Sequence, residues 1–478
     1  MSSLKKNILY NSIRVGSNLV FPLITFPYVT RIMGPDTLGL FNYITSIVAY
    51  FTLFANLGFP LYGTREIAQA KDDNNKLQDI TNAIFSANLV SCVVVYISFF
   101  ITSLFLYEDE VGFWLYLIIG LSILLSCISL DWFFQGIEDF KYITIRSIII
   151  KLISVVCLFI FVKNKDDIII YAILTVLGTC GNNLLNLIIL NKYVKLRFTF
   201  RDSIKHIKGA SVLFLGTIAV SLYTSLNSIM VGALGSMAAV AFFNIGNRLV
   251  QMMMTVLGAI TSSIIPRMSY LVGKGDEKEV IKLQKKTLLV LLYVSIPMTL
   301  GIIGLADPLI LLFGGMEFMP SAKVMQILAP LLIIITLSGF VGYQILIPKH
   351  KEKYGNYCVI GGAITNFSLN AILIPFFAEI GVAISVVISE IVVTALHFFF
   401  ARNLMSLKLR DFFPLKCIVS AIVMFVTIYI LNASFTNPLF CILCAIIGIF
   451  VYSLILALFR DDFFISTIKK KLKYEKYI

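Results

Sequence analysis

The sequence has few charged residues. Only 14% of its 478 residues are Asp, Glu, Lys or Arg, while 59% are hydrophobic. An ordinary globular chain has about 25% charged and about 45–50% apolar residues. A chain of this composition cannot cover its apolar surface in water, which excludes a soluble globular protein. The apolar residues form blocks of about 20, the length of a membrane-spanning helix, rather than the alternating pattern of a β-barrel.

The sequence also lacks the motifs of common enzymes. It contains no HExxH, no nucleotide-binding glycine loop and no DxD, and its three histidines are scattered. All eight cysteines lie inside apolar blocks, including the CxxC pair Cys441 and Cys444, where they read as small apolar side chains. Neither a disulfide framework nor a zinc site is indicated. We therefore expect no cofactor, no bound metal and no catalytic residues.

The apolar blocks predict an all-α polytopic membrane protein with about fourteen transmembrane helices. The loops expected outside the cell are short and contain only the cations Lys163, Lys165 and Lys323. The remaining loops are rich in Lys and Arg, which predicts that both termini are cytoplasmic. The net charge of +13 is then a topology signal and an attraction to bilayer lipids, not a sign of nucleic-acid binding. The predicted spans are 12–33, 37–61, 80–106, 112–135, 142–162, 168–190, 209–234, 236–266, 287–313, 320–347, 355–375, 379–401, 416–432 and 438–459.

Two segments indicate an internal repeat. MGPDTLGLFNY (33–43) follows the first predicted span, and VGALGSMAAVAFFN (231–244) follows the seventh. Each combines a glycine-containing turn with an aromatic residue followed by Asn. Repeats of this kind are typical of transporters whose site lies between the halves. We expect two six-helix bundles around a central cavity, at 1–208 and 209–402, and at 403–478 two additional helices with a basic cytoplasmic tail.

Polar residues at helical spacing predict which spans face that cavity. In the eighth span they recur at i, i+3, i+4 and i+7, which is one face of a helix. Polar faces against lipid are costly, so such faces contact protein or water. Helix–helix hydrogen bonding is the alternative to a hydrated cavity lined by spans 1, 2, 7 and 8. The candidate substrate-binding residues are Arg248, Arg31, Arg14, Asn244, Asn247, Gln251 and Asn42.

The arginines point to an anionic cargo. Arg248 lies near the middle of its span, where an arginine costs roughly 2.5–3.5 kcal/mol on insertion, and its guanidinium matches phosphate oxygens. A structural ion pair is the alternative. Arg14 and Arg31 lie near opposite ends of the first span, where they either face the cavity or reach an interface. Lys151 is central in span 142–162, outside the polar face, and is expected to pair with a carboxylate.

Two carboxylates are candidates for coupling transport to a cation gradient. Glu390 lies near the middle of the twelfth span, where burial would raise the pKa of a carboxyl group. Asp131 is the second candidate, and its position near a span end also fits solvation at the interface. The coupling ion is expected to be H⁺ or Na⁺.

Three stretches resemble the multidrug/oligosaccharidyl-lipid/polysaccharide exporter superfamily, and within it the Wzx-type flippases of O-antigen and capsule repeat units. They are VTRIMGPDTLGLFNY (29–43), YGTREIA (62–68) and DWFFQGIEDFKYITIRS (131–147). The resemblance implies a bacterial inner-membrane protein that moves an undecaprenyl-diphosphate-linked oligosaccharide to the outer leaflet by alternating access, driven by a cation gradient. A polysaccharide polymerase and glycosyltransferases are the protein partners that it implies.

Other functions remain open at the level of sequence. A multidrug or cation antiporter of the same fold would favour carboxylates in its cavity, whereas the clearest charge here is positive. A membrane-embedded polysaccharide polymerase would need catalytic groups and usually a sizeable loop. A scaffold without transport activity does not explain an arginine in the middle of a span.

Overall fold

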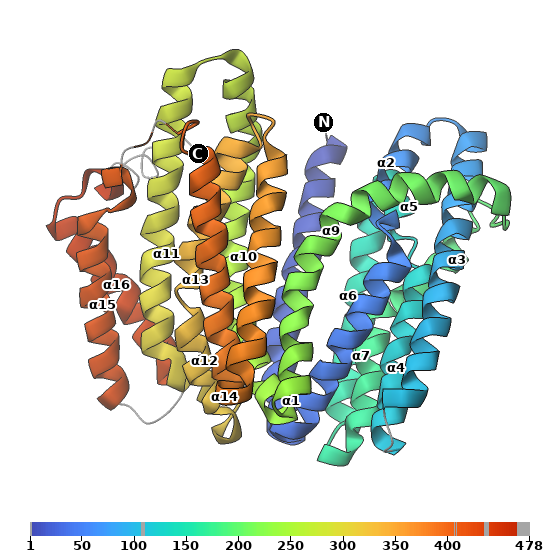
Figure 1. Cartoon of the computed structure of the whole chain (residues 1–478), viewed down its shortest axis with the longest axis horizontal. Coiled ribbons are helices and arrows are strands. Elements are labelled where there is room, and N and C mark those ends of the chain that lie inside the picture. The colour runs from blue at the N-terminus through green and yellow to red at the C-terminus, as the bar shows by residue number, and fades with distance from the viewer. Residues whose placement is uncertain (1, 107–109, 406, 408, 435–438, 466–478) are drawn as a thin grey trace. The chain divides into compact units, whose positions relative to one another are not determined.

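The computed structural model describes residues 2–106, 110–405, 407, 409–434 and 439–465. Within these residues the regular structure consists of helices, with no strand (Figure 1). Eleven continuous segments are long and apolar enough to cross a membrane. Two of them contain two spans each, and α9 (Phe200–Leu234) adds the apolar stretch Ser225–Leu234. The predicted all-α class with about fourteen spans is therefore confirmed.

The chain forms two compact units, Met1–Ala241 and Phe242–Ile478. The first contains α9 and eight helices before it. These are α1 (Ser2–Asn56), α2 (Phe59–Ala70), α3 (Asn74–Leu106), α4 (Glu110–Cys127), α5 (Asp131–Gly136), α6 (Phe140–Phe161), α7 (Ile168–Cys180) and α8 (Asn182–Leu190).

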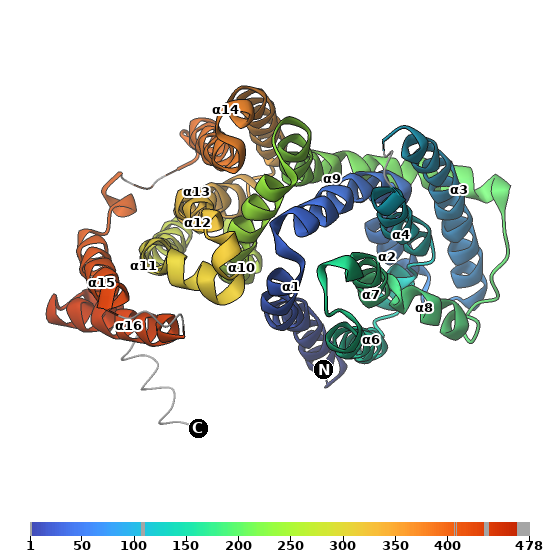
Figure 2. The same ribbon diagram turned by 90° about the horizontal axis from the view of Figure 1, so that it is seen from below.

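The second unit contains most of α10 (Met237–Lys274) and the helices after it. These are α11 (Glu277–Phe313), α12 (Pro320–Leu328), α13 (Leu331–Val341) with the π-helical turn Gly342–Leu346, α14 (Glu352–Ala401), α15 (Leu415–Ser434) and α16 (Phe440–Leu458). Helices α15 and α16 are the two additional helices, and they pack against each other and against α11 (Figure 2). The predicted basic tail lies outside the described residues from 466 onwards. The division into bundles at 1–208 and 209–402 stays a prediction.

Sharp turns divide the two longest helices. In α1 the backbone of Gly34 has φ +72°, a conformation that glycine adopts readily, and Pro35 follows it. In α14 the break is at Ala378, with φ 44°, three residues after Pro375. Both breaks separate the spans that hydropathy predicted on either side.

The two repeated segments pack together inside the first unit. Gly39 lies so close to the backbone carbonyl of Met237 that no side chain fits between them, and Gly232 lies in the same way against the ring of Tyr43. Both glycines permit α1 to approach α9 and the start of α10 closely.

Two of the stretches behind the family resemblance form the core of the first unit. Trp132 and Phe133 of α5 are buried, together with Phe59 of α2. Gly63 packs on the indole ring of Trp132, and Gly136 packs on Ile67. The predicted span 112–135 matches the candidate membrane span Glu110–Gly136, within which α4 ends at Cys127 and α5 is a separate short helix. The bulky side chains of α5 pack between α2 and its neighbours instead of extending α4.

Aspartates begin three of the helices. Asp73 accepts hydrogen bonds from the backbone N–H groups of Asn75 and Lys76 at the start of α3. The bond from Lys76 N holds the pKa of the Asp73 carboxyl below its usual value. Asp139 accepts from Tyr142 N at the start of α6, and Asp276 accepts from Glu279 N at the start of α11. Such capping satisfies backbone donors that have no partner within the helix.

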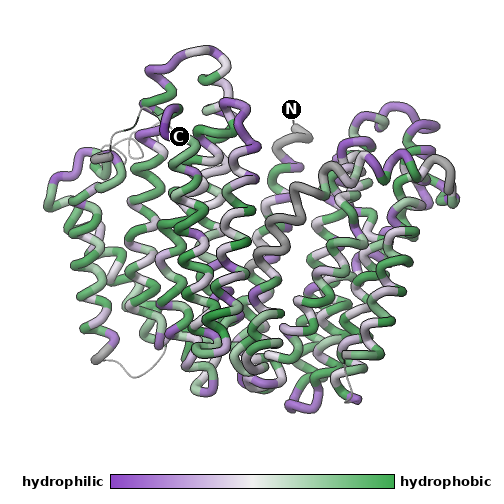
Figure 3. The backbone as a smooth tube through the Cα atoms, viewed as in Figure 1, coloured by the Kyte–Doolittle hydropathy of each residue, from purple (hydrophilic) through white to green (hydrophobic). Residues whose placement is uncertain are grey.

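The helices carry their apolar residues along their length and their hydrophilic residues at the ends (Figure 3). Large apolar side chains are exposed on many of them, such as Val94 and Ile188, whose exposed fractions are 59% and 66%. This pattern is that of helices immersed in lipid, so the chain is a multi-pass membrane protein.

Candidate functional site

Two cations from different helices lie together where α1 packs against α6. Arg14 Nη2 of α1 donates a hydrogen bond to Asn11 Oδ1 at 3.1 Å. Lys151 Nζ of α6 donates to Asn18 Oδ1, also on α1. The guanidinium of Arg14 is close enough to act electrostatically on the ammonium of Lys151. The result is a small polar site of two positive charges and two amides.

Helical geometry explains this arrangement. Asn11, Arg14 and Asn18 occupy positions i, i+3 and i+7 of α1 and therefore share a face. Contacts near both ends of α6 hold that face towards it. Thr144 Oγ1 donates to the Tyr10 carbonyl at 3.0 Å, and Tyr28 Oη donates to the Val162 carbonyl at 2.7 Å.

No carboxylate balances these two charges. Among the residues that the structure describes, neither Arg14 nor Lys151 forms an ion pair. The Nε of Arg14 is buried and has no hydrogen-bond partner. Charges at membrane depth are costly unless paired, so two neighbouring cations with a spare donor favour binding of an anion.

The structure corrects the predicted place of Lys151. The sequence places Lys151 outside the polar faces of spans 1, 2, 7 and 8 and predicts a carboxylate as its partner, but its partner is the amide of Asn18 on α1. Spacing within α6 could not indicate this, because the contact joins residues 133 positions apart. The signal in the sequence was a lysine in an apolar run, which indicates that Lys151 lies within a membrane span but not which residue it contacts.

Arg31 and Asn42 lie farther along α1. Arg31 is exposed and precedes the break at Gly34, and Asn42 is half-buried after it. At about 1.5 Å per residue, Arg31 is roughly 25 Å along the helix from Arg14. The structure therefore does not bring these two residues into the Arg14–Lys151 site. Ser46 donates to the backbone carbonyl of Asn42, which shows that part of this polar face is satisfied within its own helix.

Helix α10 has one side that packs against protein and another that is more exposed. Gly246 packs so closely on the Ser321 carbonyl at the start of α12 that a larger side chain would not fit there. Leu249 and Val250 are buried. The remaining side of the helix carries four of the predicted residues. Asn244 and Asn247 are half-buried there, whereas Arg248 and Gln251 are exposed. That these residues share a cavity with α1 stays a prediction.

The two predicted coupling carboxylates have different surroundings. Glu390 is half-buried in the second part of α14, next to the buried Ser389. Asp131 forms an ion pair with Arg146, with 2.6 Å between Asp131 Oδ1 and Arg146 Nη2. A role in coupling stays a prediction for both.

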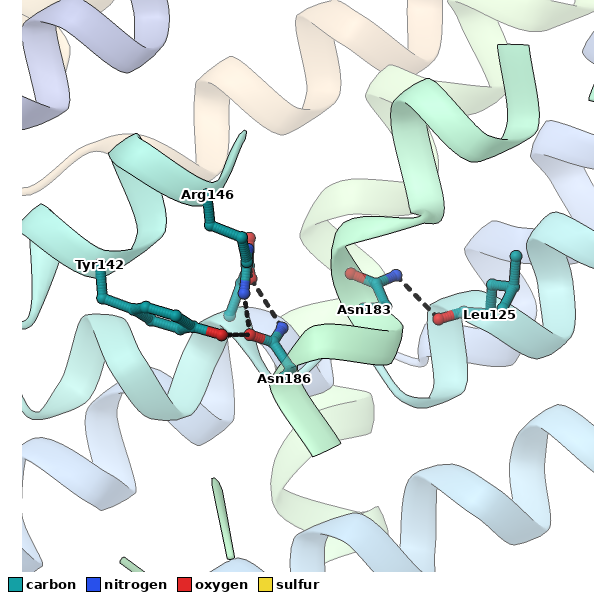
Figure 4. A network of polar contacts seen from close by, with 6 residues as sticks. Leu125, Tyr142, Arg146, Asn183 and Asn186 are labelled. Atoms are coloured by element: carbon teal, nitrogen blue, oxygen red, sulfur yellow. Dashed lines mark hydrogen bonds and ion pairs between the residues drawn. The ribbon is translucent and has the colours of Figure 1, made fainter. Parts of the chain in front are cut away.

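Asp131 belongs to a polar network in the first unit, and Figure 4 shows Tyr142, Arg146 and Asn186 of that network. The side chain of Arg146 is only 4% exposed. Besides the ion pair, it donates to Asn186 Oδ1, and its guanidinium lies 5.0 Å from the centre of the Tyr142 ring. Asn186 Nδ2 in turn donates to Asp131 Oδ1 at 3.0 Å. The network joins α5, α6 and α8, and the sequence alone had not singled out Arg146 or Asn186.

The second unit contains an apolar cavity of 630 Å³ between α11, α15 and α16. The lining is almost wholly hydrophobic, with a few polar atoms from Tyr293, Tyr452 and Ser453. A cavity of this size accommodates a long hydrocarbon segment. Its apolar lining includes Met253, Pro297, Met298, Leu305, Leu309, Phe313, Met424, Ile428, Ile442 and Ile449.

A metal centre is not evident in the described part of the chain, where no three His, Cys, Asp or Glu side chains gather.

Known proteins resemble this chain over most of its length. The family described as Polysaccharide biosynthesis protein matches residues 4–272, and the MatE family matches residues 213–372. A protein of Escherichia coli strain K12 named "Putative O-antigen transporter" is 30% identical over 84% of this chain and 97% of its own. A protein of the same name from Shigella dysenteriae is 27% identical over 82% and 98%. The solved structure of the lipid II flippase MurJ, in an inward closed conformation, superposes with a TM-score of 0.77 at 17% identity, covering 95% of this chain and 99% of that one.

Proposed function

Because the chain belongs to the family of polysaccharide biosynthesis proteins, we propose that it is a flippase that moves a lipid-linked oligosaccharide from one leaflet of the membrane to the other. The family match confirms the resemblance to Wzx-type transporters of the multidrug/oligosaccharidyl-lipid/polysaccharide exporter superfamily. The relatives named as O-antigen transporters support an oligosaccharide as cargo. The protein acts as a transporter rather than as an enzyme.

The observation that carries this proposal is the Arg14–Lys151 pair. Two cations without a carboxylate between them, at membrane depth, suit a diphosphate. Guanidinium and ammonium groups form strong charge-assisted hydrogen bonds with phosphate oxygens. Arg248 on the polar face of α10 supplies a further cation, and Arg31 a fourth. The amides of Asn244, Asn247, Gln251 and Asn42 are donors and acceptors for sugar hydroxyls.

The apolar cavity between α11, α15 and α16 supports a long-chain lipid carrier. A polyprenyl chain is not accommodated by a polar site, so a protein that moves it needs apolar surface as well. The 630 Å³ cavity of the second unit provides such a surface. We infer that the carrier is a polyprenyl diphosphate such as undecaprenyl diphosphate.

The proposed setting is the inner membrane of a bacterium, with both termini in the cytoplasm, as the cations of the loops favour. Transport then runs from the cytoplasmic to the outer leaflet by alternating access. Glycosyltransferases supply the cargo, and a polysaccharide polymerase consumes it.

Arg248→Ala is expected to lower transport about ten- to a hundredfold, the value of one or two charge-assisted hydrogen bonds. The gene is deleted in its host, variants are reintroduced, and surface polysaccharide and cytoplasmic lipid-linked sugar are measured. Lys274→Ala, at the end of the same helix, is the matched control and should remain active. Full activity of Arg248→Ala at normal abundance in the membrane would remove Arg248 from the binding site.

We infer that a proton or sodium gradient drives transport and that Glu390 is involved. Glu390→Gln removes the charge but keeps the shape, so gradient-stimulated transport should fall roughly fivefold or more, while cargo binding is retained. The assay is transport by membrane vesicles at imposed pH or sodium gradients. Glu379→Gln, at the break in the same helix, is the control. Gradient dependence unchanged in Glu390→Gln would contradict this role.

The second candidate is a multidrug or cation antiporter, which the MatE match over residues 213–372 favours. Phenotypes of the same deletion strain distinguish the flippase from the antiporter. Hypersensitivity to cationic drugs with normal surface polysaccharide would support the antiporter, and loss of polysaccharide with unchanged drug sensitivity supports the flippase.

A further inference from the structure

A second site lies where α6 begins beside α8. A pocket of 440 Å³ opens there. Asp139 and Lys141 are at its polar end, and Arg146 forms part of its wall. Its apolar side is formed by Ile145 and Ile149 of α6 and Leu185 of α8.

Arg146 presents a donor that the protein does not use. The side chain is 4% exposed, and its two terminal nitrogens bind Asp131 and Asn186. The remaining Nε is buried and has no hydrogen-bond partner. A single water occupies about 30 Å³, so the pocket beside Arg146 has room for a much larger ligand.

The charges of the pocket are balanced. Lys141 contributes a positive charge and Asp139 a negative one, and the charge of Arg146 is matched by Asp131. A purely anionic ligand would therefore be repelled by the Asp139 carboxylate, because it has no positive group to bind there. A ligand that carries one charge of each sign complements both side chains.

The position and the apolar side point to a lipid. The pocket lies at the first residues of the membrane span Phe140–Phe161, where lipid head groups lie. Ile145 and Ile149 are 44% and 50% exposed and follow one another by one turn along the outer face of α6. They continue from the polar end of the pocket into the hydrocarbon region, as an acyl chain does.

We propose that this pocket binds a zwitterionic phospholipid with a primary ammonium group, of the phosphatidylethanolamine class. The lipid phosphate accepts a hydrogen bond from Lys141 Nζ. The ammonium donates to the carboxylate of Asp139, and an acyl chain lies along Ile145, Ile149 and Leu185. The loop charges place this lipid in the leaflet predicted to be cytoplasmic.

The test is native mass spectrometry of the purified full chain with added phosphatidylethanolamine, phosphatidylcholine or phosphatidylglycerol of identical acyl chains. Phosphatidylcholine carries the same charges but its quaternary ammonium has no N–H to donate. Asp139→Asn removes the charge and keeps a residue that caps helices well. Lys141→Ala removes the phosphate contact, and Lys76→Ala, an exposed lysine of the same unit, is the control.

We expect the unmodified chain to bind phosphatidylethanolamine about tenfold more tightly than phosphatidylcholine, the effect of a charge-assisted hydrogen bond. Asp139→Asn should abolish that preference. Lys141→Ala should weaken the binding of both lipids about tenfold. Lys76→Ala should change the binding of neither lipid. Tighter binding of phosphatidylglycerol than of phosphatidylethanolamine would overturn the proposal. So would a preference that persists in Asp139→Asn, or equal binding of all three lipids.

Discussion

Replacing both Arg14 and Lys151 with alanine is expected to reduce transport about a thousandfold, to near the level of a strain without the gene. Each cation contributes roughly 1.5–3 kcal/mol through charge-assisted hydrogen bonds to phosphate, and tenfold corresponds to about 1.4 kcal/mol. The variant should still reach the membrane, because it removes two like charges that repel each other. Surface polysaccharide, normalised to the amount of protein in the membrane, measures the effect.

The variant in which the two side chains are exchanged, Arg14→Lys with Lys151→Arg, is the control for this result. It keeps both positive charges and alters only their geometry, so it should retain a substantial part of the activity. If the double alanine variant transports normally, the two cations do not bind the cargo. If the exchanged variant is as inactive as the double alanine variant, shape rather than charge determines the site.

Arg146→Met is expected to destabilise the first unit by about 3 kcal/mol. The substitution leaves Asp131 and Asn186 without their shared partner, and removing one member of a buried ion pair typically costs about 3–5 kcal/mol. Partial exposure of Asp131 places the effect at the lower end. For a unit of this size the unfolding temperature in detergent should fall by roughly 5–10 °C.

A second substitution separates the ion pair from simple loss of packing. Adding Asp131→Leu to Arg146→Met removes the unpaired carboxylate, so part of the lost stability should return. An unfolding temperature that is unchanged in Arg146→Met would show that the network contributes nothing. A double variant less stable than the sum of the two single effects would show that packing, not charge, dominates.

Much of the fold could be predicted because hydropathy depends on local sequence. The breaks at Gly34–Pro35 and after Pro375 were visible as breakers between apolar runs, and the structure divides α1 and α14 there. The fourth span, 112–135, also matches the candidate span Glu110–Gly136, but hydropathy did not indicate the helix break inside it. Residues 131–135 are apolar enough to continue α4, but Trp132 and Phe133 are anchored in the core with α2, and this tertiary packing ends α4 early.

The site was predicted less completely, because a helical face shows that a residue is turned inwards but not what it meets. The polar faces of α1 and α10 follow from spacing alone. The partner of Lys151 is a residue of α1 far away in the sequence. The sequence marks Asp131 as a candidate coupling carboxylate near a span end, whereas its ion pair with Arg146 depends on how α5 turns towards α6.

The most direct test of the central claim is reconstitution of the purified chain in liposomes with a fluorescent polyprenyl-diphosphate-linked oligosaccharide. The fraction of probe accessible to an added membrane-impermeant quencher reports its distribution between leaflets. We expect rapid exchange that depends on the protein and is lost in the Arg14→Ala, Lys151→Ala variant. Exchange no faster than in protein-free liposomes, from protein that is folded and inserted, would contradict it.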